Sequence, residues 1–255
     1  MSAFPNVFSL EKQNVLITGG GTGIGQAIAV AMHAAGASVV LVGRREAELR
    51  ATAQQMGERA HVFVHDITHL NDADKLVQRV VEQVGPIHCL VNNAGIHLKK
   101  PAVETTMEEF QNVLNTHILG AHALIRVLAP GMISRKSGSI LFTASMASIF
   151  GIPQVVAYSA AKGAMLGMVR TLATELSPQG VRVNAIAPGW IETEMSRKAF
   201  AGDPARAQKV LGRTPLAKFG KPSDIGWAAV YLASAAAEFV TGVTLPVDGG
   251  VSIGF

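Results

Sequence analysis

The sequence predicts an α/β fold in which residues 1–255 form one domain, a doubly wound parallel sheet flanked by helices. Short apolar runs of strand length alternate strictly with helical patterns along the chain, which is typical of parallel sheets. The runs are continuously apolar, as in strands buried on both faces. With 255 residues, 49% of them hydrophobic and only 16% charged, the chain can bury a large core.

Four strands are expected in the first half of the chain, with helices between them. Gly36 and Gly57 are natural stops for the first two helices, and Gly85-Pro86 ends the third. Asn71 can N-cap that third helix, whose apolar positions repeat with a period near 3.6. The expected strands are 14–18, 38–42, 62–64 and 87–91, and the helices run from the glycine turn to 36, over 46–56 and over 71–84.

The second half continues the same alternation, with one interruption. A polar, mixed stretch at about 191–215 breaks the pattern, and we expect it to be a substrate-loop insert. The expected helices are 107–128, 154–176 and 223–235, and the expected strands are 139–143, 181–186 and 243–247.

Composition and charge argue against several other classes of protein. The net charge of +4 suits an anionic cofactor or substrate, but no basic run is interleaved with aromatics, so no nucleic-acid partner is expected. No apolar run is long enough to span a membrane, and residues 1–5 lack a signal core, so we expect a cytoplasmic protein. The single Cys89 fits a buried thiol. His65 and His69 are four residues apart but leave a strand, so no metal site is expected.

An anion site is predicted where the first strand meets the first helix. The turn at 18–25 reads Thr-Gly-Gly-Gly-Thr-Gly-Ile-Gly, and it opens onto a helical pattern whose N–H groups and dipole would face a phosphate. Gly19 permits the tight turn, Gly23 lets a pyrophosphate approach, and Gly25 lets the helix pack close to the strand. On these residues alone, a glycine-rich loop without a ligand is the alternative.

A second constellation, Ser145, Tyr158 and Lys162, lies in the middle of the chain. Tyr158 and Lys162 are four apart on a predicted helix, so their side chains share a face. A free tyrosine has a pKa of about 10, and a neighbouring ammonium is expected to lower it. Ser145 follows a strand at the edge where open α/β sheets bind ligands. Each residue taken singly is also compatible with a structural role.

These motifs occur in the order found in the short-chain dehydrogenase/reductase family, which the sequence resembles from about residue 10 to its end. The resemblance implies a Rossmann fold and hydride transfer at a C–OH/C=O centre with a nicotinamide cofactor. The motifs that carry it are Thr18-Gly19-x-x-x-Gly23-x-Gly25, Asn92-Asn93-Ala94-Gly95, Ser145 thirteen residues before Tyr158, Tyr158-x-x-x-Lys162, Pro188-Gly189 and Val247-Asp248-Gly249-Gly250.

The resemblance also implies a role for each motif residue. Tyr158 would be the general acid–base, Ser145 would orient the carbonyl or hydroxyl, and Lys162 would hold the nicotinamide ribose and tune Tyr158. Asn93 would stabilise the sheet near the adenine-side ribose, and Asp66 would reach the adenine. Thr193 would contact the nicotinamide amide or the phosphates. The cofactor-binding residues so implied are Gly19, Thr22, Gly23, Ile24, Gly25, Arg44, Arg45, Asp66, Ile67, Asn93, Ala94, Gly95, Tyr158, Lys162, Pro188, Gly189, Ile191 and Thr193.

Cofactor preference should be determined at the end of the second strand. Sites for NAD carry an acid about 20 residues after the glycine turn, where it binds the ribose 2′-OH. Here that position is Gly43, followed by Arg44 and Arg45. Without an acid at Gly43, and with arginines directly after it, the site suits the 2′-phosphate of NADP, so NADP is expected, with NAD possible. A solvated basic pair opening a helix is the alternative.

One position departs from the family pattern. Where the family carries an Asn on the long helix, three residues ahead of a Gly in many members, this chain has His117 before Gly120. Asn115 lies about 200° away on an α-helix and so points elsewhere. His117 is therefore a candidate catalytic residue, which could shuttle protons because an imidazole titrates near pH 6.5. A packed helix residue is the alternative.

The leading prediction is an NADP-preferring dehydrogenase acting on a sugar, polyol or sugar acid. The segments 96–100 and 190–195 look similar to the gluconate 5-dehydrogenase branch, which has a basic pair where this chain has Lys99 and Lys100. A 3-oxoacyl-carrier-protein reductase is the second possibility, although residues 173–175 lack the expected basic residue. A nucleotide-sensing protein without turnover is the third. A homotetramer is expected, with its interface on apolar C-terminal elements: Trp227, Ala228, Val230, Tyr231, Leu232 and 243–247.

Overall fold

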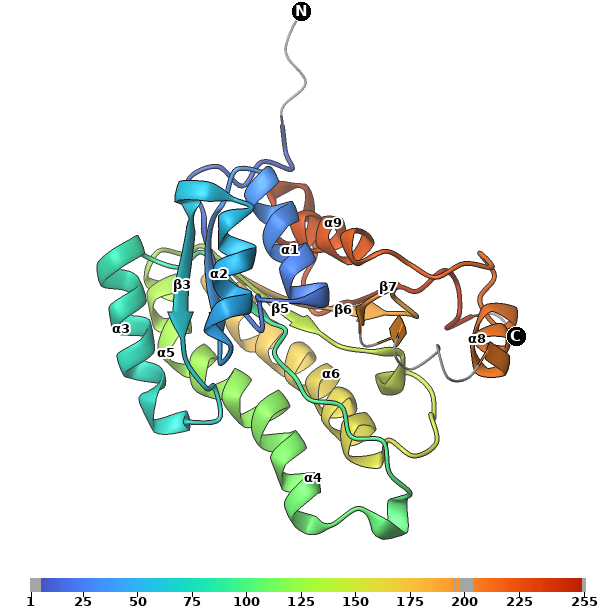
Figure 1. Ribbon diagram of the computed structural model, residues 1–255. Helices are drawn as coiled ribbons and strands as arrows, with labels where there is room; N and C mark the ends of the chain where they lie inside the picture. The colour runs from blue at the N-terminus through green and yellow to red at the C-terminus, as the bar shows by residue number, and fades with distance from the viewer. Residues whose placement is uncertain (1–5, 195, 198–203, 254–255) are drawn as a thin grey trace, which may run out of the picture.

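The computed structural model describes residues 6–194, 196–197 and 204–253, and in them seven parallel strands form one sheet (Figure 1). The strand order is β3-β2-β1-β4-β5-β6-β7, so the order reverses between β1 and β4, where open α/β sheets bind their ligands. The strands are β1 (Asn14–Thr18), β2 (Ser38–Gly43), β3 (Ala60–Val64), β4 (Cys89–Asn92), β5 (Gly138–Thr143), β6 (Val181–Pro188) and β7 (Thr244–Val247).

Helices cover both faces of the sheet, as the fold-class prediction requires. Helices α1, α2 and α9 share one hydrophobic core with the sheet, and α3, α5 and α6 share the other. The helices are α1 (Gly23–Ala34), α2 (Glu46–Gln54), α3 (Ala73–Val84), α4 (Met107–Leu114), α5 (Gly120–Ser134), α6 (Val156–Leu176), α8 (Pro204–Gly212) and α9 (Pro222–Ala233).

The strands form where the sequence is continuously apolar, because both sides of the sheet are buried. In β1, Leu16 packs into the core under α3, α5 and α6, whereas Val15 and Ile17 pack into the core under α1, α2 and α9. All three side chains are fully buried. The free thiol of Cys89 is buried in the same way, as expected. The predicted fold class is confirmed.

Several element ends differ from the prediction for local reasons. The third helix begins after a 3-10 turn at Leu70–Asp72, so Asp72 takes the N-cap position that we expected for Asn71. The sixth helix begins at Val156, because Gln154 has a φ of 67°, outside the helical region. The insert holds a helix, α8, which was not expected. Residues 195 and 198–203 of this insert, and the N-terminal residues 1–5, lie outside the described residues.

The long helix predicted over 107–128 extends to Ser134 and is not uniform. A π-helical segment, η4 (Asn115–Leu119), joins α4 to α5 within one continuous rod, visible in Figure 1. This stretch is the one helix among the described residues that is long and apolar enough to cross a membrane. Half of its most apolar window is buried inside the protein, and it packs against α3 and α6, as core helices do.

Candidate active site

A cavity of 1380 Å³ lies at the carboxyl edge of the sheet. Residues directly after β1, β2, β4, β5 and β6 line it, so the cavity follows the switch point of the strand order. It brings together every residue predicted for catalysis or cofactor binding: Gly19, Thr22, Gly23, Ile24, Gly25, Arg44, Arg45, Asp66, Ile67, Asn93, Ala94, Gly95, His117, Ser145, Tyr158, Lys162, Pro188, Gly189, Ile191 and Thr193.

The glycine turn after β1 has the geometry of a phosphate cradle. Gly19 and Gly23 have φ values of 66° and 59°, a region that favours glycine. A Cβ on Gly25 would lie 2.1 Å from the Gly19 carbonyl oxygen, so this helix can approach the strand only with glycine there. Thr22, the N-cap of α1, makes no side-chain cap hydrogen bond, and the first turn of α1 contains no acidic residue. No acidic side chain of the first turn therefore neutralises the positive end of α1, which faces the cavity and can bind a pyrophosphate.

Asn93 links three strands at the floor of the cavity. Its amide donates to the backbone oxygens of Thr18 (3.1 Å) and Gly19 (3.3 Å), and its oxygen accepts the Thr143 hydroxyl at 3.2 Å. The Thr18 hydroxyl oxygen in turn accepts the backbone N–H groups of Asn93 and Ala94, both at 3.0 Å. These bonds hold the ends of β1, β4 and β5 in register beneath the glycine turn.

Two arginines follow β2 and are anchored differently. Arg44 lies 3.6 Å from the carboxylate of Asp66, whereas Arg45 donates to the Thr22 hydroxyl at 3.0 Å and pairs with Glu48 at 3.1 Å. Burial alone would raise the pKa of Asp66, but hydrogen bonds from Thr68 and the charge of Arg44 lower it. Both arginine side chains are more than 60% exposed and line the cavity, so an anionic group in it can reach them.

The tyrosine, serine and lysine meet at the other end of the cavity. The Lys162 ammonium lies 5.5 Å from the centre of the Tyr158 ring and donates to the Thr143 carbonyl oxygen. Burial lowers the pKa of Lys162 to about 7. Burial also raises the pKa of Tyr158, and a hydrogen bond with Ser145 offsets part of that rise. The expectation that a nearby ammonium lowers the Tyr158 pKa is wrong for this structure, because burial raises that pKa and only the Ser145 hydrogen bond opposes the rise.

Two imidazoles flank the Tyr158 ring. His117 meets it edge-on, with ring centres 5.5 Å apart and planes at 83°, and His97 lies tilted at 54° with centres 5.0 Å apart. His117 is only 2% exposed, and burial together with the charge of Lys162 lowers its pKa to about 3. His97 is exposed. Sequence reasoning did not single out His97, whose one available signal is its position just after the motif that ends at Gly95.

The contacts of His117 hold the segment after β4. Its Nε2 lies 3.1 Å from the Ile96 nitrogen and 2.8 Å from the Ile96 oxygen. A Cβ on Gly95 would lie 2.2 Å from the imidazole, so the ring packs directly against that backbone. Among the described residues, the buried Nδ1 atom has no hydrogen-bond partner. Asn115 points away, as expected, and accepts a hydrogen bond from Gln111 at 2.8 Å.

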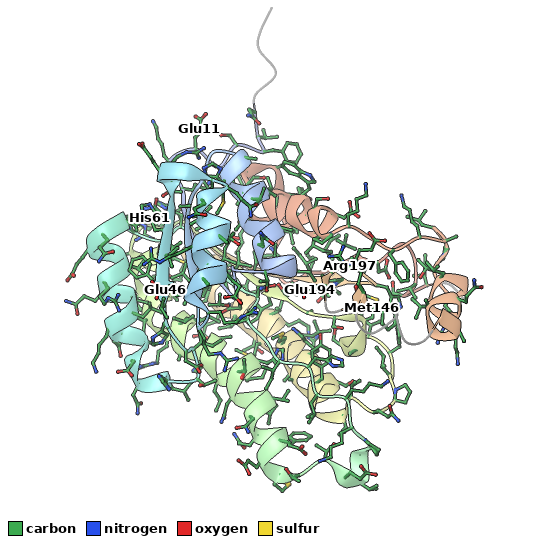
Figure 2. All side chains as sticks on the ribbon, viewed as in Figure 1. Glu11, Glu46, His61, Met146, Glu194 and Arg197 are labelled. Atoms are coloured by element: carbon green, nitrogen blue, oxygen red, sulfur yellow. The ribbon has the colours of Figure 1, made fainter. Side chains whose placement is uncertain are left out.

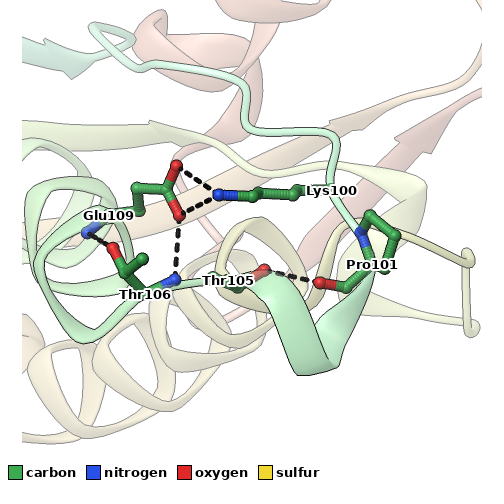
Figure 3. A network of polar contacts seen from close by, with 5 residues as sticks. All are labelled: Lys100, Pro101, Thr105, Thr106 and Glu109. Atoms are coloured by element: carbon green, nitrogen blue, oxygen red, sulfur yellow. Dashed lines mark hydrogen bonds and ion pairs between the residues drawn. The ribbon is translucent and has the colours of Figure 1, made fainter.

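The two lysines of segment 96–100 have different surroundings. Lys99 is exposed and lines the cavity. Lys100 instead contacts both carboxylate oxygens of Glu109 at 3.0 Å (Figure 3). Glu109 also closes a capping box with Thr106 at the start of α4, which lowers the pKa of the carboxyl. Of the basic pair, only Lys99 can therefore meet a ligand in the cavity.

Side chains that follow β5 and β6 complete the wall of the cavity. Figure 2 labels three of them, Met146, Glu194 and Arg197, and Trp190 and Glu192 also line it. Met195, part of the segment that resembles the gluconate 5-dehydrogenase branch, lies outside the described residues.

No metal centre is formed by the described residues. No group of three or more His, Cys, Asp or Glu side chains in them is arranged so that it could hold a metal ion. His65 and His69, the pair with ligand-like spacing, have ring centres 6.4 Å apart and meet edge-on.

Comparison with known proteins places this chain among enzymes of one family. A family model described as enoyl-(acyl carrier protein) reductase matches residues 19–252. The chain is 35% identical to 5-keto-D-gluconate 5-reductase of Escherichia coli K12, covering 97% of this chain and 98% of that one. It is 37% identical to galactitol 2-dehydrogenase (L-tagatose-forming) of Cereibacter sphaeroides, covering 98% and 99%. It is also 34% identical to a 3-oxoacyl-[acyl-carrier-protein] reductase of Thermotoga maritima, covering 96% and 99%.

A solved structure agrees with these relatives. The gluconate 5-dehydrogenase of Burkholderia cenocepacia, in complex with NADP and tartrate, is 31% identical and superimposes with a TM-score of 0.92 over 98% of each chain. Similarity of this extent covers the whole sheet, the glycine turn and the Ser145, Tyr158 and Lys162 constellation. The chain belongs to the short-chain dehydrogenase/reductase family of NAD(P)-dependent oxidoreductases.

Proposed function

We propose that this protein is an NADP-preferring oxidoreductase that interconverts a secondary alcohol and a ketone on a sugar acid or polyol. The observation that carries the proposal is one cavity that joins Arg44 and Arg45 at one end to Ser145, Tyr158 and Lys162 at the other. A phosphorylated dinucleotide can span such a cavity from the basic end to the acid–base end.

NADP fits the residues present. The open N-terminus of α1 suits the pyrophosphate. Arg44 and Arg45 suit the 2′-phosphate, since the residue at the end of β2 is Gly43 and not an acid. The structural relative from Burkholderia cenocepacia was crystallised with NADP, which supports the choice. When bound, the cofactor supplies or accepts the hydride.

Three side chains carry the acid–base chemistry in this proposal. Tyr158 exchanges a proton with the substrate oxygen, and Ser145 holds that oxygen by a hydrogen bond. Lys162 holds the ribose, and its position against the Thr143 carbonyl keeps it within 5.5 Å of the tyrosine ring. We assign His117 to packing, because it stays neutral and binds the Ile96 backbone.

Lys99 is the side chain that favours a sugar acid. It lines the cavity, whereas Lys100 is paired with Glu109, so Lys99 is the lysine available to a carboxylate. Relatives that act on 5-keto-D-gluconate and galactitol support a polyhydroxylated substrate. The similarity to a 3-oxoacyl-[acyl-carrier-protein] reductase keeps a carbonyl reductase of that type as the alternative.

Turnover assays with a panel of sugar acids, polyols, ketones and 3-oxoacyl thioesters test the proposal. The sugar acids or polyols should give the highest kcat/KM. Tyr158→Phe should lower turnover by at least about 10²-fold, the usual contribution of a general acid–base, while NADPH binding stays intact. A variant that keeps more than about a tenth of wild-type turnover would contradict the assignment of Tyr158.

The cofactor preference can be reversed by two substitutions. Gly43→Asp with Arg44→Ile brings a carboxylate to the ribose and removes a phosphate partner, so kcat/KM should shift from NADP toward NAD. Arg50→Ile is the matched control, because Arg50 pairs with Glu46 on α2 and is not among the residues that line the cavity. An unmodified protein that already prefers NAD tenfold would overturn the proposal.

We further propose that the protein works as a cytoplasmic homotetramer. Exposed apolar side chains at the C-terminal elements support an interface there, among them Trp227, Phe239 and Val243. A second exposed apolar set, Val103 and Met107, lies at the start of α4. Two distinct apolar surfaces are what a closed tetramer requires.

A further inference from the structure

We infer that Asp66 increases the preference for NADP over NAD by holding Arg44 in place for the 2′-phosphate, an inference that rests on the proposed function. Arg44 directly follows β2, and Asp66 comes two residues after β3, the neighbouring strand. The strands stay paired to their ends, since the His65 backbone N–H donates to the Gly43 carbonyl oxygen at 2.9 Å. Arg44 and Asp66 therefore leave the sheet side by side, and both line the cavity.

The two carboxylate oxygens of Asp66 have different partners. Oδ1 accepts hydrogen bonds from the backbone N–H of Thr68 at 3.0 Å and from the Thr68 hydroxyl at 2.8 Å. Oδ2 lies 3.6 Å from Nη1 of Arg44. Hydrogen bonds from Thr68 and the charge of Arg44 lower the pKa of Asp66, so the carboxylate is ionised at neutral pH. One oxygen thus fixes the side chain to its own loop, and the other attracts the guanidinium.

Holding Arg44 in advance matters because its side chain is long and 66% exposed. Such a side chain loses rotamer freedom when it binds a phosphate, and it loses less if a partner already restricts it. Arg45 has its own partners, the Thr22 hydroxyl and the Glu48 carboxylate, so we expect Asp66 to act on Arg44.

The negative charge of Asp66 has an opposing effect, because it repels a phosphate. Asp66 follows β3, which lies one strand farther from β1 and its glycine turn than β2 does. The Arg44 guanidinium also offsets its charge. We therefore expect the positioning of Arg44 to outweigh the repulsion. The two effects have opposite signs, so removal of the charge distinguishes them.

Calorimetric binding of adenosine 2′,5′-bisphosphate and adenosine 5′-monophosphate tests the inference without turnover. Their affinity ratio isolates the 2′-phosphate, because a contact with adenine contributes to both ligands. Asp66→Asn keeps the shape of the side chain and an oxygen for Thr68 but loses the charge that faces Arg44. The ratio should fall about threefold to fivefold, the upper range for a partly exposed ion pair. Glu46→Gln is the matched control and should keep the wild-type ratio, because Glu46 pairs with Arg50 outside the cavity.

Two further variants test whether Asp66 acts through Arg44. In an Arg44→Ile background, Asp66→Asn should no longer lower the ratio, since the partner is gone. Thr68→Val removes one hydrogen bond from Oδ1 and leaves the charge, and Thr68 is not among the residues that line the cavity. It should lower the ratio by about twofold, the effect of one weak hydrogen bond. If Asp66→Asn does not fold, Thr68→Val decides the matter.

The ratio of kcat/KM for NADP to that for NAD should change in step with the binding ratio. An Asp66→Asn variant with an unchanged or raised binding ratio would overturn the inference. So would an equal fall in the Arg44→Ile background. A wild type that binds the monophosphate as tightly as the bisphosphate would instead refute the proposed preference for NADP, so the two failures are distinguishable.

Discussion

Burial is the main cause of the pKa shifts of Tyr158 and the titratable groups around it. Desolvation disfavours the charged form of each, so it raises the pKa of Tyr158 and lowers those of Lys162 and His117. In the free protein at neutral pH, Tyr158 and His117 are therefore uncharged, whereas Lys162 is near the midpoint of its titration. An anionic cofactor beside Lys162 would favour its ammonium form, which couples cofactor binding to activation of the tyrosine.

Lys162 should make the stability of the free protein depend on pH. Its pKa is about 7 in the folded state and about 10.4 in the unfolded state. Between these values the unfolded chain binds more protons, so the contribution of this lysine to stability rises with pH. The cost of burying the ammonium is complete below pH 7 and disappears above about pH 10.

Urea unfolding of wild type and Lys162→Met at pH 6.5 and pH 9.5 measures this effect. Wild type should gain stability relative to Lys162→Met as the pH rises between the two values. The exposed Lys218→Met serves as the control. If wild type gains as much stability between the two pH values relative to Lys218→Met as it does relative to Lys162→Met, Lys162 is not the source of the gain.

At the scale of elements, the rod formed by α4, η4 and α5 determines where the site segments lie. The π-helical turn η4 carries His117 toward Tyr158, while the capping box at Thr106 fixes where α4 starts. Glu109 of that box also binds Lys100, which ties the helix start to the segment after β4 (Figure 3). The start of α4 thus positions the segment after β4, which carries both His97 and Lys99.

Loss of the cap should lower stability measurably. Thr106→Ala removes a side-chain acceptor for the Glu109 backbone N–H, and we expect the free energy of unfolding to fall by about 1 kcal/mol. Thr174→Ala makes the same change in the exposed interior of α6, where alanine is the better helix former, so no loss is expected. Equal losses in the two variants by urea denaturation would contradict the assigned cap.

At the scale of the whole molecule, the exposed apolar surface is what supports the proposed tetramer. Val230 and Leu232, which we expected in the interface, are instead 3% and 0% exposed and pack into the core under α9. The expectation for these two residues is wrong because they face the sheet. Trp227 on the same helix is 56% exposed, and Phe239 just after it is fully exposed.

Light scattering at micromolar concentration should give four times the chain mass of 26.7 kDa. Phe239→Asp should shift the mass toward smaller species, because a carboxylate cannot be buried in an apolar interface without a partner. Glu238→Asp is the matched control beside it. A monomeric wild type, or a Phe239→Asp variant that remains tetrameric, would contradict the proposed interface.

The amino-acid sequence alone determined the fold class and the approximate positions of all seven strands. Strand formation depends on local apolar runs, which are present in the sequence whatever the rest of the chain does. The spacing of Ser145, Tyr158 and Lys162 and the glycine turn likewise predicted residues that line one cavity, since each follows a strand end or shares a helix face.

Only the tertiary structure decided which neighbours these residues have. The contact between His97 and Tyr158 joins segments 61 residues apart. The π-helical turn that carries His117 and the pairing of Lys100 with Glu109 also depend on how the chain folds back on itself. The shift of the Tyr158 pKa is of the same kind, because it depends on how much water the surrounding chain excludes. Burial and contact arise from packing, and no local pattern of residue types records them.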